Sequence, residues 1–430
     1  MNYTEFLKLL SRELVVALGC TEPIAVAYAA ALAREHVRGS EVEAVDVFVS
    51  GNVVKNAMSV TIPGTGHCGV DMAAALGVVA GDATRTLEVL SGIDEKDVQA
   101  AEDLVRRGIV NVQVADSDKK LYIEVNIRTA DSCARAVVAD EHTKIGLVEV
   151  DGLVINRAEE NVQQADEGEE ELSFLSIDSI WDFVEHADIR DLDIVRHSMD
   201  LNGAIAAEGL RNPYGLQVGK MIQDNIERKI LGDDIVNQAT ALTAAAADAR
   251  MAGCPLPVVS NSGSGNQGIS ATVPVLAVGR RLGASEERIL RAVTLSHLIA
   301  IFIKSKFGRL SALCGAIVSG TGAACGIAYL LGGDVATVKM AIQNMLGNVT
   351  GMLCDGAKPG CALKVATCTN AAAQSALLAV RGFGIKPTDG IIETSPVHSI
   401  DNLCRIGNQG TIEMDKIILD IMLNKQDRAG

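Results

Sequence analysis

The periodicity of apolar residues in this 430-residue chain changes at one place, an acidic run that starts near residue 158. Before the run, apolar and polar residues alternate in four segments, 41–50, 109–129, 133–142 and 145–155. Alternation with a period of two is typical of strands with one buried face. Two segments with helical spacing precede these strands, and almost every apolar segment after the run has helical spacing. The change predicts an α+β fold, with an N-terminal α+β domain (1–172) followed by a mainly α-helical domain (173–430).

The acidic run accounts for most of the net charge of −16. Residues 158–189 contain eleven Asp or Glu and no Lys or Arg, so the rest of the chain has 43 acidic residues (54 minus 11) against 38 basic ones. Such a local concentration of one charge is typical of a solvated linker or an exposed helix face. The chain has no basic stripe with interleaved aromatic residues, and we therefore expect no nucleic-acid partner.

The uncharged segment 310–333 is long enough to cross a membrane. However, it contains six Gly, two Ser and one Thr against only seven Leu, Ile or Val. This composition favours a buried helix, and we expect no membrane partner. The first residues, MNYTEFLKLL, lack the basic and apolar regions of a signal peptide, so we expect a cytoplasmic protein with reduced thiols.

Clustered cysteines in a reducing compartment indicate metal binding or catalysis more than disulfides. Cys314, Cys354 and Cys361 are 40 and 7 positions apart and form no CxxC pair, which argues against a ferredoxin-type cluster and a structural zinc site. Three thiolates from separate loops are what a 4Fe-4S cluster with one open, Lewis-acidic iron requires. The spacing alone leaves open that these thiols are small hydrophobic groups packed in the core.

Other candidate ligand-binding groups lie beside predicted helix starts. Cys20 directly precedes a helix N-terminus, where unpaired N–H groups favour a thiolate, although a buried packing residue is the alternative. The segment 258–274 combines small residues, which allow close backbone approach, with polar side chains suited to a small ligand. These side chains are Ser262, Ser264, Asn266 and Gln267. The Gly-rich turn in 61–77 could bind a carboxylate, but it has neither a dinucleotide-binding nor a P-loop motif.

Six motifs occur in order over essentially the whole chain: GCTEPIAVAYAAA, NVVKNAMSVTIPGTG, SGSGNQG, LSALCGAIVSGTGAACGIAYL, MLCDGAKPGCALK and RIGNQGTIEMDKIIL. Together they resemble the bacterial and archaeal L-cysteine desulfidase family, which is similar to the iron–sulfur-dependent L-serine dehydratases. Residues 64–77 resemble a turn in the β part of those dehydratases. The chain from about residue 173 resembles the start of their catalytic α part, which implies that the helical domain is the catalytic one.

The resemblance implies a lyase that uses a 4Fe-4S cluster and no pyridoxal phosphate (PLP). L-cysteine would undergo β-elimination to sulfide and 2-aminoacrylate, which hydrolyses to pyruvate and ammonia. Cys314, Cys354 and Cys361 match the cluster ligands of the family, and Cys20 matches a cysteine that serves as base or displaceable fourth ligand. The sequence ends LNKQDRAG and lacks the C-terminal cysteine that the serine dehydratases can present to their cluster.

The remaining candidate residues are assigned either to substrate binding or to packing in the core. Lys55 and Asn56, with the SGSGNQG segment, are candidates for holding the carboxylate of an amino-acid substrate in the geometry for reaction. Cys325 and Cys368 are expected to be packing residues.

Several alternatives remain open at this point. They are an L-serine dehydratase on the same cluster, a non-catalytic iron–sulfur sensor or small-molecule binding protein, and PLP catalysis. The Gly-rich loops favour an enzyme over a sensor, because a sensor needs a cluster but no turns shaped for an amino acid. The sequence does not determine the oligomeric state, although a homodimer is possible.

Overall fold

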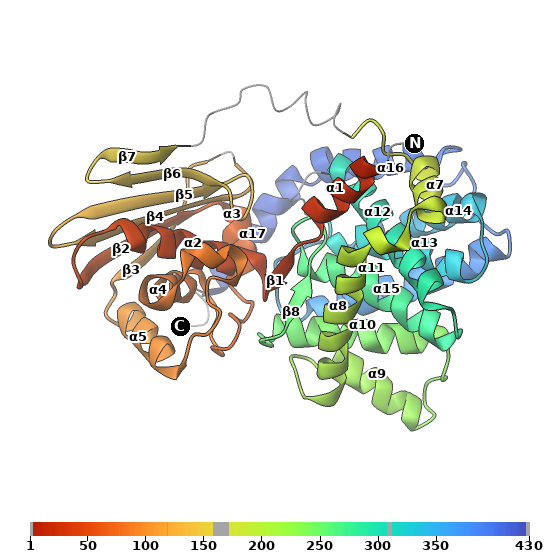
Figure 1. Cartoon of the computed structure of the whole chain (residues 1–430), viewed down its shortest axis with the longest axis horizontal. Coiled ribbons are helices and arrows are strands. Elements are labelled where there is room, and N and C mark those ends of the chain that lie inside the picture. The colour runs from red at the N-terminus through yellow and green to blue at the C-terminus, as the bar shows by residue number, and fades with distance from the viewer. Residues whose placement is uncertain (1–2, 118, 158–171, 308–311, 427–430) are drawn as a thin grey trace.

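A computed structural model describes residues 3–117, 119–157, 172–307 and 312–426. Figure 1 shows two bodies side by side, an α/β body (residues 21–157) and a larger helical body (residues 177–410). This architecture confirms the predicted α+β fold class. The linker predicted from the acidic run falls mainly on 158–171, which lie outside the described residues, and the domain boundary at 172–173 stays a prediction.

The α/β body is built on a six-stranded sheet with the order β3-β2-β4-β5-β6-β7. Its strands are β2 (Val42–Val49), β3 (Val110–Val114), β4 (Tyr122–Thr129), β5 (Cys133–Ala139), β6 (Ile145–Val150) and β7 (Leu153–Arg157). β2 and β3 run parallel, and the other neighbouring pairs are antiparallel. Val45 and Val47 of β2 and Ile123 and Val125 of β4 are fully buried, which confirms the predicted period of two.

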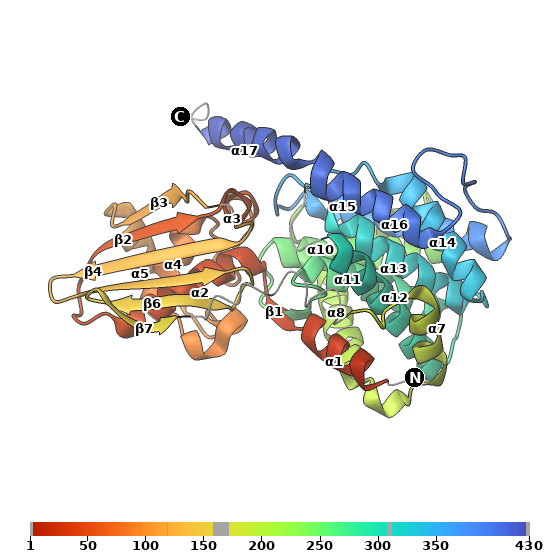
Figure 2. The same ribbon diagram turned by 90° about the horizontal axis from the view of Figure 1, so that it is seen from above.

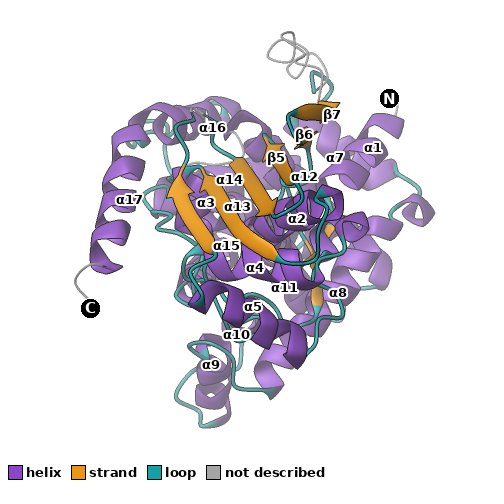
Figure 3. Cartoon of the chain, turned by 90° about the vertical axis from the view of Figure 1, so that its left-hand side faces the viewer, coloured by secondary structure: helices purple, strands orange, loops and turns teal. Residues whose placement is uncertain are grey.

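Ala-rich helices pack against this sheet. The helical elements of the α/β body are α2 (Thr21–His36), α3 (Gly51–Ala57), α4 (Val70–Ala80), η1 (Ala83–Glu88) and α5 (Glu95–Arg106). α2 and α4 approach closely at Gly77, where an added Cβ would lie only 2.2 Å from the carbonyl oxygen of Ala27. In Figure 3 this body faces the viewer, with its strands and helices in front of the helical body.

The helical body surrounds a buried central helix, α13. Its elements are α7 (Ile177–His186), η2 (Ile189–Asp191), α8 (Asp193–Arg211), α9 (Val218–Glu227), α10 (Ile235–Met251), α11 (Gly265–Arg281), α12 (Glu286–Phe307), α13 (Gly315–Leu330), α14 (Val335–Val349), α15 (Cys361–Val380), α16 (Pro396–Arg405) and the π-helical turn η3 (Ile406–Gly410). α11, α12, α14 and α15 pack around α13, and every residue of α13 from 316 to 328 is buried. The uncharged segment therefore contains a buried helix, as predicted. Among the described residues, none of the helices has both the length and the apolar character needed to cross a membrane.

Both ends of the chain connect the two bodies. α1 (Thr4–Glu13) lies on the helical body, where the Phe6 ring stacks on Phe183 with centroids 4.6 Å apart. β1 (Val16–Leu18) then pairs antiparallel with β8 (Pro257–Val259). α17 (Ile412–Gln426) leaves the helical body and reaches α3 of the α/β body (Figure 2).

Candidate active site

A cavity of about 140 Å³ lies between the two bodies. The start of α2 and part of α3 line it from the α/β body, and the starts of α11, α13 and α15 line it from the helical body. Every side chain that the sequence singled out for a site role lies in its wall: Cys20, Lys55, Asn56, Ser262, Ser264, Asn266, Gln267, Cys314, Cys354 and Cys361. The fold therefore brings the sequence-predicted residues together, while their individual roles stay predictions.

Three cysteines reach the cavity from neighbouring backbone segments. The backbone N–H of Cys314 donates to the Met352 carbonyl (2.9 Å), and the N–H of Cys354 donates to the Ala312 carbonyl (2.7 Å). These two hydrogen bonds hold the loop before α13 against the loop before α15. Cys361 is the first residue of α15, and its side chain is half-buried like those of the other two.

Burial and mutual proximity control the ionisation of these thiols. Burial, followed by the neighbouring Cys354, raises the pKa of Cys314 to about 12, and burial also raises the pKa of Cys361. Such thiols are protonated at neutral pH, so a metal has to displace their protons when it binds. Among the described residues, no three His, Cys, Asp or Glu side chains could share one metal ion. In a 4Fe-4S cluster each thiolate binds a different iron, which is a wider arrangement.

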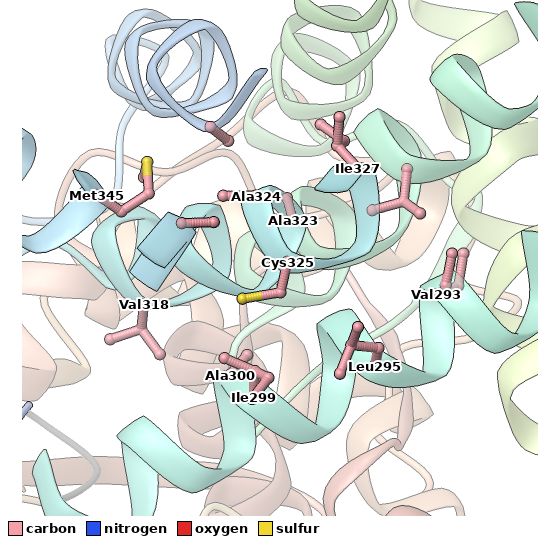
Figure 4. Close-up of a cluster of buried hydrophobic side chains, with 14 of the residues drawn as sticks. Val293, Leu295, Ile299, Ala300, Val318, Ala323, Ala324, Cys325, Ile327 and Met345 are labelled. Carbon is pink, nitrogen blue, oxygen red and sulfur yellow. The ribbon is translucent and has the colours of Figure 1, made fainter. Parts of the chain in front are cut away.

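Cys325 and Cys368 lie in the core, as expected for packing residues. Both side chains are fully buried, and neither lines the cavity. Figure 4 shows Cys325 among apolar side chains that include Val318, Ile299 and Leu295.

The environment of Cys20 corrects one expectation. Cys20 lies directly before α2 as predicted, where it is the N-cap residue, but its Sγ–H donates to Glu22 Oε2 over 3.1 Å. Burial and then the negative charge of Glu22 raise the pKa of Cys20 well above its usual value, and Arg250 offsets only part of this effect. The group is therefore a thiol rather than the expected thiolate, because burial and a nearby carboxylate outweigh the helix N-terminus.

Sequence reasoning missed Glu22, the buried carboxylate beside Cys20. It accepts hydrogen bonds from Cys20, from the Thr21 hydroxyl (3.1 Å) and from the Asn56 amide (3.1 Å). Burial alone would raise the pKa of Glu22, but His142 and the Cys20 hydrogen bond outweigh it and lower the pKa. A charged residue in the first turn, directly before the apolar, Ala-rich run of residues 23–33, was the sequence signal that could have identified it.

Arg250 is a second missed residue, at the end of α10. It is only 3% exposed, and its Nη1 donates to Asn266 Oδ1 over 3.1 Å. A Cβ on Gly265 would lie 2.3 Å from Arg250 Nε, so a larger residue where the SGSGNQG segment crosses the guanidinium would displace it. Within the described residues, Arg250 Nε and Gln267 Oε1 are buried without a hydrogen-bond partner. The cavity wall thus contains a guanidinium and an amide with unused hydrogen-bonding capacity.

A buried histidine forms hydrogen bonds to residues on both sides of the SGSGNQG segment. His297 on α12 is fully buried and hydrogen-bonds Asn261 (3.0 Å), Thr272 (3.0 Å) and Ser198 (3.2 Å). Burial lowers the pKa of His297 to about 3, so the imidazole is neutral. Ser264 caps α11 by accepting a hydrogen bond from the Gln267 N–H. The loop is therefore fixed at both of its ends.

Lys55 and Asn56 lie on α3, and each has a partner that the sequence did not indicate. The ammonium of Lys55 is 2.6 Å from Asp415 Oδ1 on α17, and the Asn56 amide donates to Glu22. His142, from the turn between β5 and β6, also lines the cavity. A Cβ built on Gly263 would lie 3.7 Å from its ring, so the two bodies are in close contact here.

Comparison with known proteins gives consistent matches. A family model described as serine dehydratase alpha chain matches residues 84–420. The UPF0597 protein of Oleidesulfovibrio alaskensis is 46% identical over 426 residues, covering 99% of each chain. The UPF0597 proteins of Clostridium perfringens and Photobacterium profundum are each 42% identical over 98% of both chains.

Proposed function

Because this chain belongs to the serine dehydratase alpha chain family, we propose that it is a lyase that removes the β-substituent of a small amino acid. The proposed substrate is L-cysteine, and the products are sulfide, pyruvate and ammonia. The observation that carries this proposal is the meeting of Cys314, Cys354 and Cys361 with Cys20 and several polar side chains in one interdomain cavity. Sulfide leaves with a proton, and 2-aminoacrylate then hydrolyses to pyruvate and ammonia.

The three cysteines fit a 4Fe-4S cluster. Their thiols are half-buried, line the same cavity and come from adjoining loops, which is the donor set that a cluster with one open iron needs. The family is of the iron–sulfur-dependent type, which supports the same cofactor. When bound, the cluster would supply a Lewis acid that activates the leaving group.

The polar side of the cavity is suited to a carboxylate. Arg250 presents a buried guanidinium, and planar guanidinium groups pair with carboxylates through two parallel hydrogen bonds. Asn266 orients that guanidinium through its Oδ1, and the Gln267 amide lies in the same wall. These groups would hold the amino acid with its Cα towards the start of α2.

Proton removal from Cα is assigned to Cys20 acting with Glu22. Cys20 carries its proton in the resting site, so it can act as a base only after this proton passes to Glu22. The 3.1 Å hydrogen bond provides that path. Because the pKa of Cys20 is raised and that of Glu22 is lowered, this transfer is unfavourable in the resting site and has to be driven by substrate binding before the thiolate accepts the Cα proton. Asn56 and Thr21 hold the Glu22 carboxylate in place during the transfer.

L-serine is the second candidate substrate, and the description of the matching family favours it. Both amino acids have the same carboxylate, amine and Cα–H, so the groups above would bind either one. The leaving group distinguishes the two reactions, because water is lost from serine and sulfide from cysteine.

An anaerobic assay tests this function. Protein reconstituted with iron and sulfide should release pyruvate from an L-amino acid, with stoichiometric sulfide if the substrate is L-cysteine. A kcat/KM higher for L-cysteine than for L-serine would support the desulfidase assignment, and the reverse would support a serine dehydratase. Absence of pyruvate from both substrates, with the cluster present, would instead support an iron–sulfur sensor or binding protein. Full activity of iron-free protein with added PLP would contradict the proposed cofactor.

A further inference from the structure

Lys55 is a buried lysine that forms an ion pair with a residue far along the chain. Its side chain is 3% exposed, and its Nζ lies 2.6 Å from Asp415 Oδ1. Asp415 belongs to α17, at the other end of the chain, and its own side chain is 26% exposed. An ammonium group shielded from water needs an anionic partner, because without one it loses its proton or moves towards solvent.

α17 is seated on α3 by close packing as well as by charge. A Cβ on Gly51, the first residue of α3, would lie 2.6 Å from Leu419 Cδ2. Leu419 follows Asp415 by about one helical turn, so both side chains face α3. Figure 2 shows α17 extending from the helical body along the α/β body. The Lys55–Asp415 pair therefore lies at a tightly fitted contact.

Lys55 also forms part of the wall between two cavities. It lines the candidate active site and a second cavity of about 460 Å³ between α3 and α17, which Asp415 lines as well. Gly356, in the loop between Cys354 and Cys361, has φ of +91°, and a Cβ there would lie 2.2 Å from the Lys55 carbonyl oxygen. A shift of Lys55 would thus disturb both the substrate side and the cysteine loop.

We infer that Asp415 is a positioning residue for the substrate carboxylate. By holding the Lys55 ammonium in the wall between the cavities, Asp415 keeps a positive charge beside the place where an amino-acid carboxylate would bind. Asp415 itself does not line the candidate active site, so it acts through Lys55. The inference rests on the proposed function, and it makes the C-terminal helix part of the substrate-binding machinery.

Kinetics of three variants test the inference. Asp415→Asn removes the charge with little change in shape, and we expect KM for L-cysteine to rise about tenfold or more, with kcat changed less than about threefold. Lys55→Met should raise KM similarly, and the double variant should be no worse than Lys55→Met, because the two residues act as one unit. Asp420→Asn is the matched control, since Asp420 is exposed on the same helix and accepts a hydrogen bond from Asn424. It should behave like wild type, and a KM increase equal to that of Asp415→Asn would overturn the inference.

Hydrogen exchange of the α3 amides gives a readout that does not depend on activity. Residues 51–57 should exchange faster in Asp415→Asn than in wild type or Asp420→Asn. The swapped variant, Lys55→Asp with Asp415→Lys, should recover slow exchange but keep a high KM, because the positive charge is then on α17. Recovery of KM by the swap, or unchanged exchange in Asp415→Asn, would overturn the positioning role. If wild type turned over no amino acid, the proposed function would fail, and the exchange data would still decide whether Asp415 holds Lys55 and α3.

Discussion

A cysteine directly before a helix start ionises to a thiolate only where burial and nearby negative charge do not outweigh the effect of the helix N-terminus. The helix start next to Cys20 was predictable from the GCTEP sequence, because Gly, Thr and Pro mark the start of a helix, although the N-cap is Cys20 itself and not Thr21. The side-chain contact with Glu22 and the burial of both residues depend on tertiary packing and were not predictable. The position of Cys20 was therefore readable from the sequence, but its protonation state was not.

Replacement of Cys20 separates its chemical role from packing. We expect Cys20→Ala to slow solvent deuterium exchange at Cα of L-cysteine by a factor of about 10²–10⁴, because a general base is lost. Glu22→Gln should have a comparable effect, since a neutral amide cannot take the Cys20 proton. A packing residue would instead cost roughly 1 kcal/mol of stability and little rate. Wild-type exchange rates in Cys20→Ala would exclude the base role, and a changed resting cluster spectrum would indicate a ligand role.

Cys361 and Cys368 are a matched pair for testing the cluster ligands, because both lie on α15. Cys361 faces the cavity, whereas Cys368 is fully buried away from it. We expect Cys361→Ser to lose bound iron and activity together, and Cys368→Ser to retain both. Iron and acid-labile sulfide content per chain is the measurement. Iron loss in Cys368→Ser with retention in Cys361→Ser would show that the ligand assignment is wrong.

The neutral His297 makes stability depend on pH. The pKa of an unfolded histidine is about 6.5, and burial lowers it to about 3 in the folded chain, so only the unfolded state takes up a proton between these values. The contribution of His297 to the free energy of unfolding is fully present above pH 6.5 and decreases as the pH falls. At pH 5 it is smaller by about 2 kcal/mol. Urea unfolding at pH 7.5 and pH 5 should show a smaller loss in His297→Gln than in wild type. His398→Gln, at an exposed position, should keep the wild-type loss.

At the scale of elements, the periodicity identified most helices and strands but not their ends. Residues 5–18 have helical spacing, yet α1 ends at Glu13 and Val16–Leu18 form β1. β-branched Val15 and Val16 favour extended backbone, and β8 supplies a pairing partner from a segment about 240 residues away. Similarly, 109–129 contains two strands, β3 and β4, rather than one. Local patterns cannot include such distant partners.

Close contact between α11 and β8 depends on Gly268. A Cβ at this position would lie 1.9 Å from the Val259 carbonyl oxygen, which is backbone and cannot move aside. We expect Gly268→Ala to lower the free energy of unfolding by at least about 2 kcal/mol. Gly351→Ala, where nothing lies within 4 Å of the added Cβ, should change it by less than about 0.5 kcal/mol. Denaturant titration of both variants is the test, and equal stability would contradict the proposed fit.

At the scale of the whole molecule, the candidate site lies where the two bodies meet. The residues of this site were found by motif resemblance and by residue type, whereas their common location is a result of tertiary structure. Arg250, His142 and Asp415 could not be identified from the sequence around them. In sequence, a single charged residue that is buried in a helix or turn looks the same as the many charged residues on the surface. Interdomain pairs such as Lys55 with Asp415 become visible only after both bodies are assembled.

An interdomain cluster site with only three protein thiolates predicts sensitivity to oxygen. In the proposed cluster Cys314, Cys354 and Cys361 would supply three ligands, and Cys20, the remaining cysteine in the cavity wall, is a protonated thiol paired with Glu22. An iron without a thiolate ligand is the one most easily lost to oxidation and chelators. We expect activity to decay in air and to return on anaerobic treatment with ferrous iron and a thiol reductant. The fold should persist throughout, because the cores of both bodies contain no predicted ligand, so circular dichroism should stay unchanged while activity is lost. Full activity after prolonged aeration with a chelator would contradict the cluster-based mechanism.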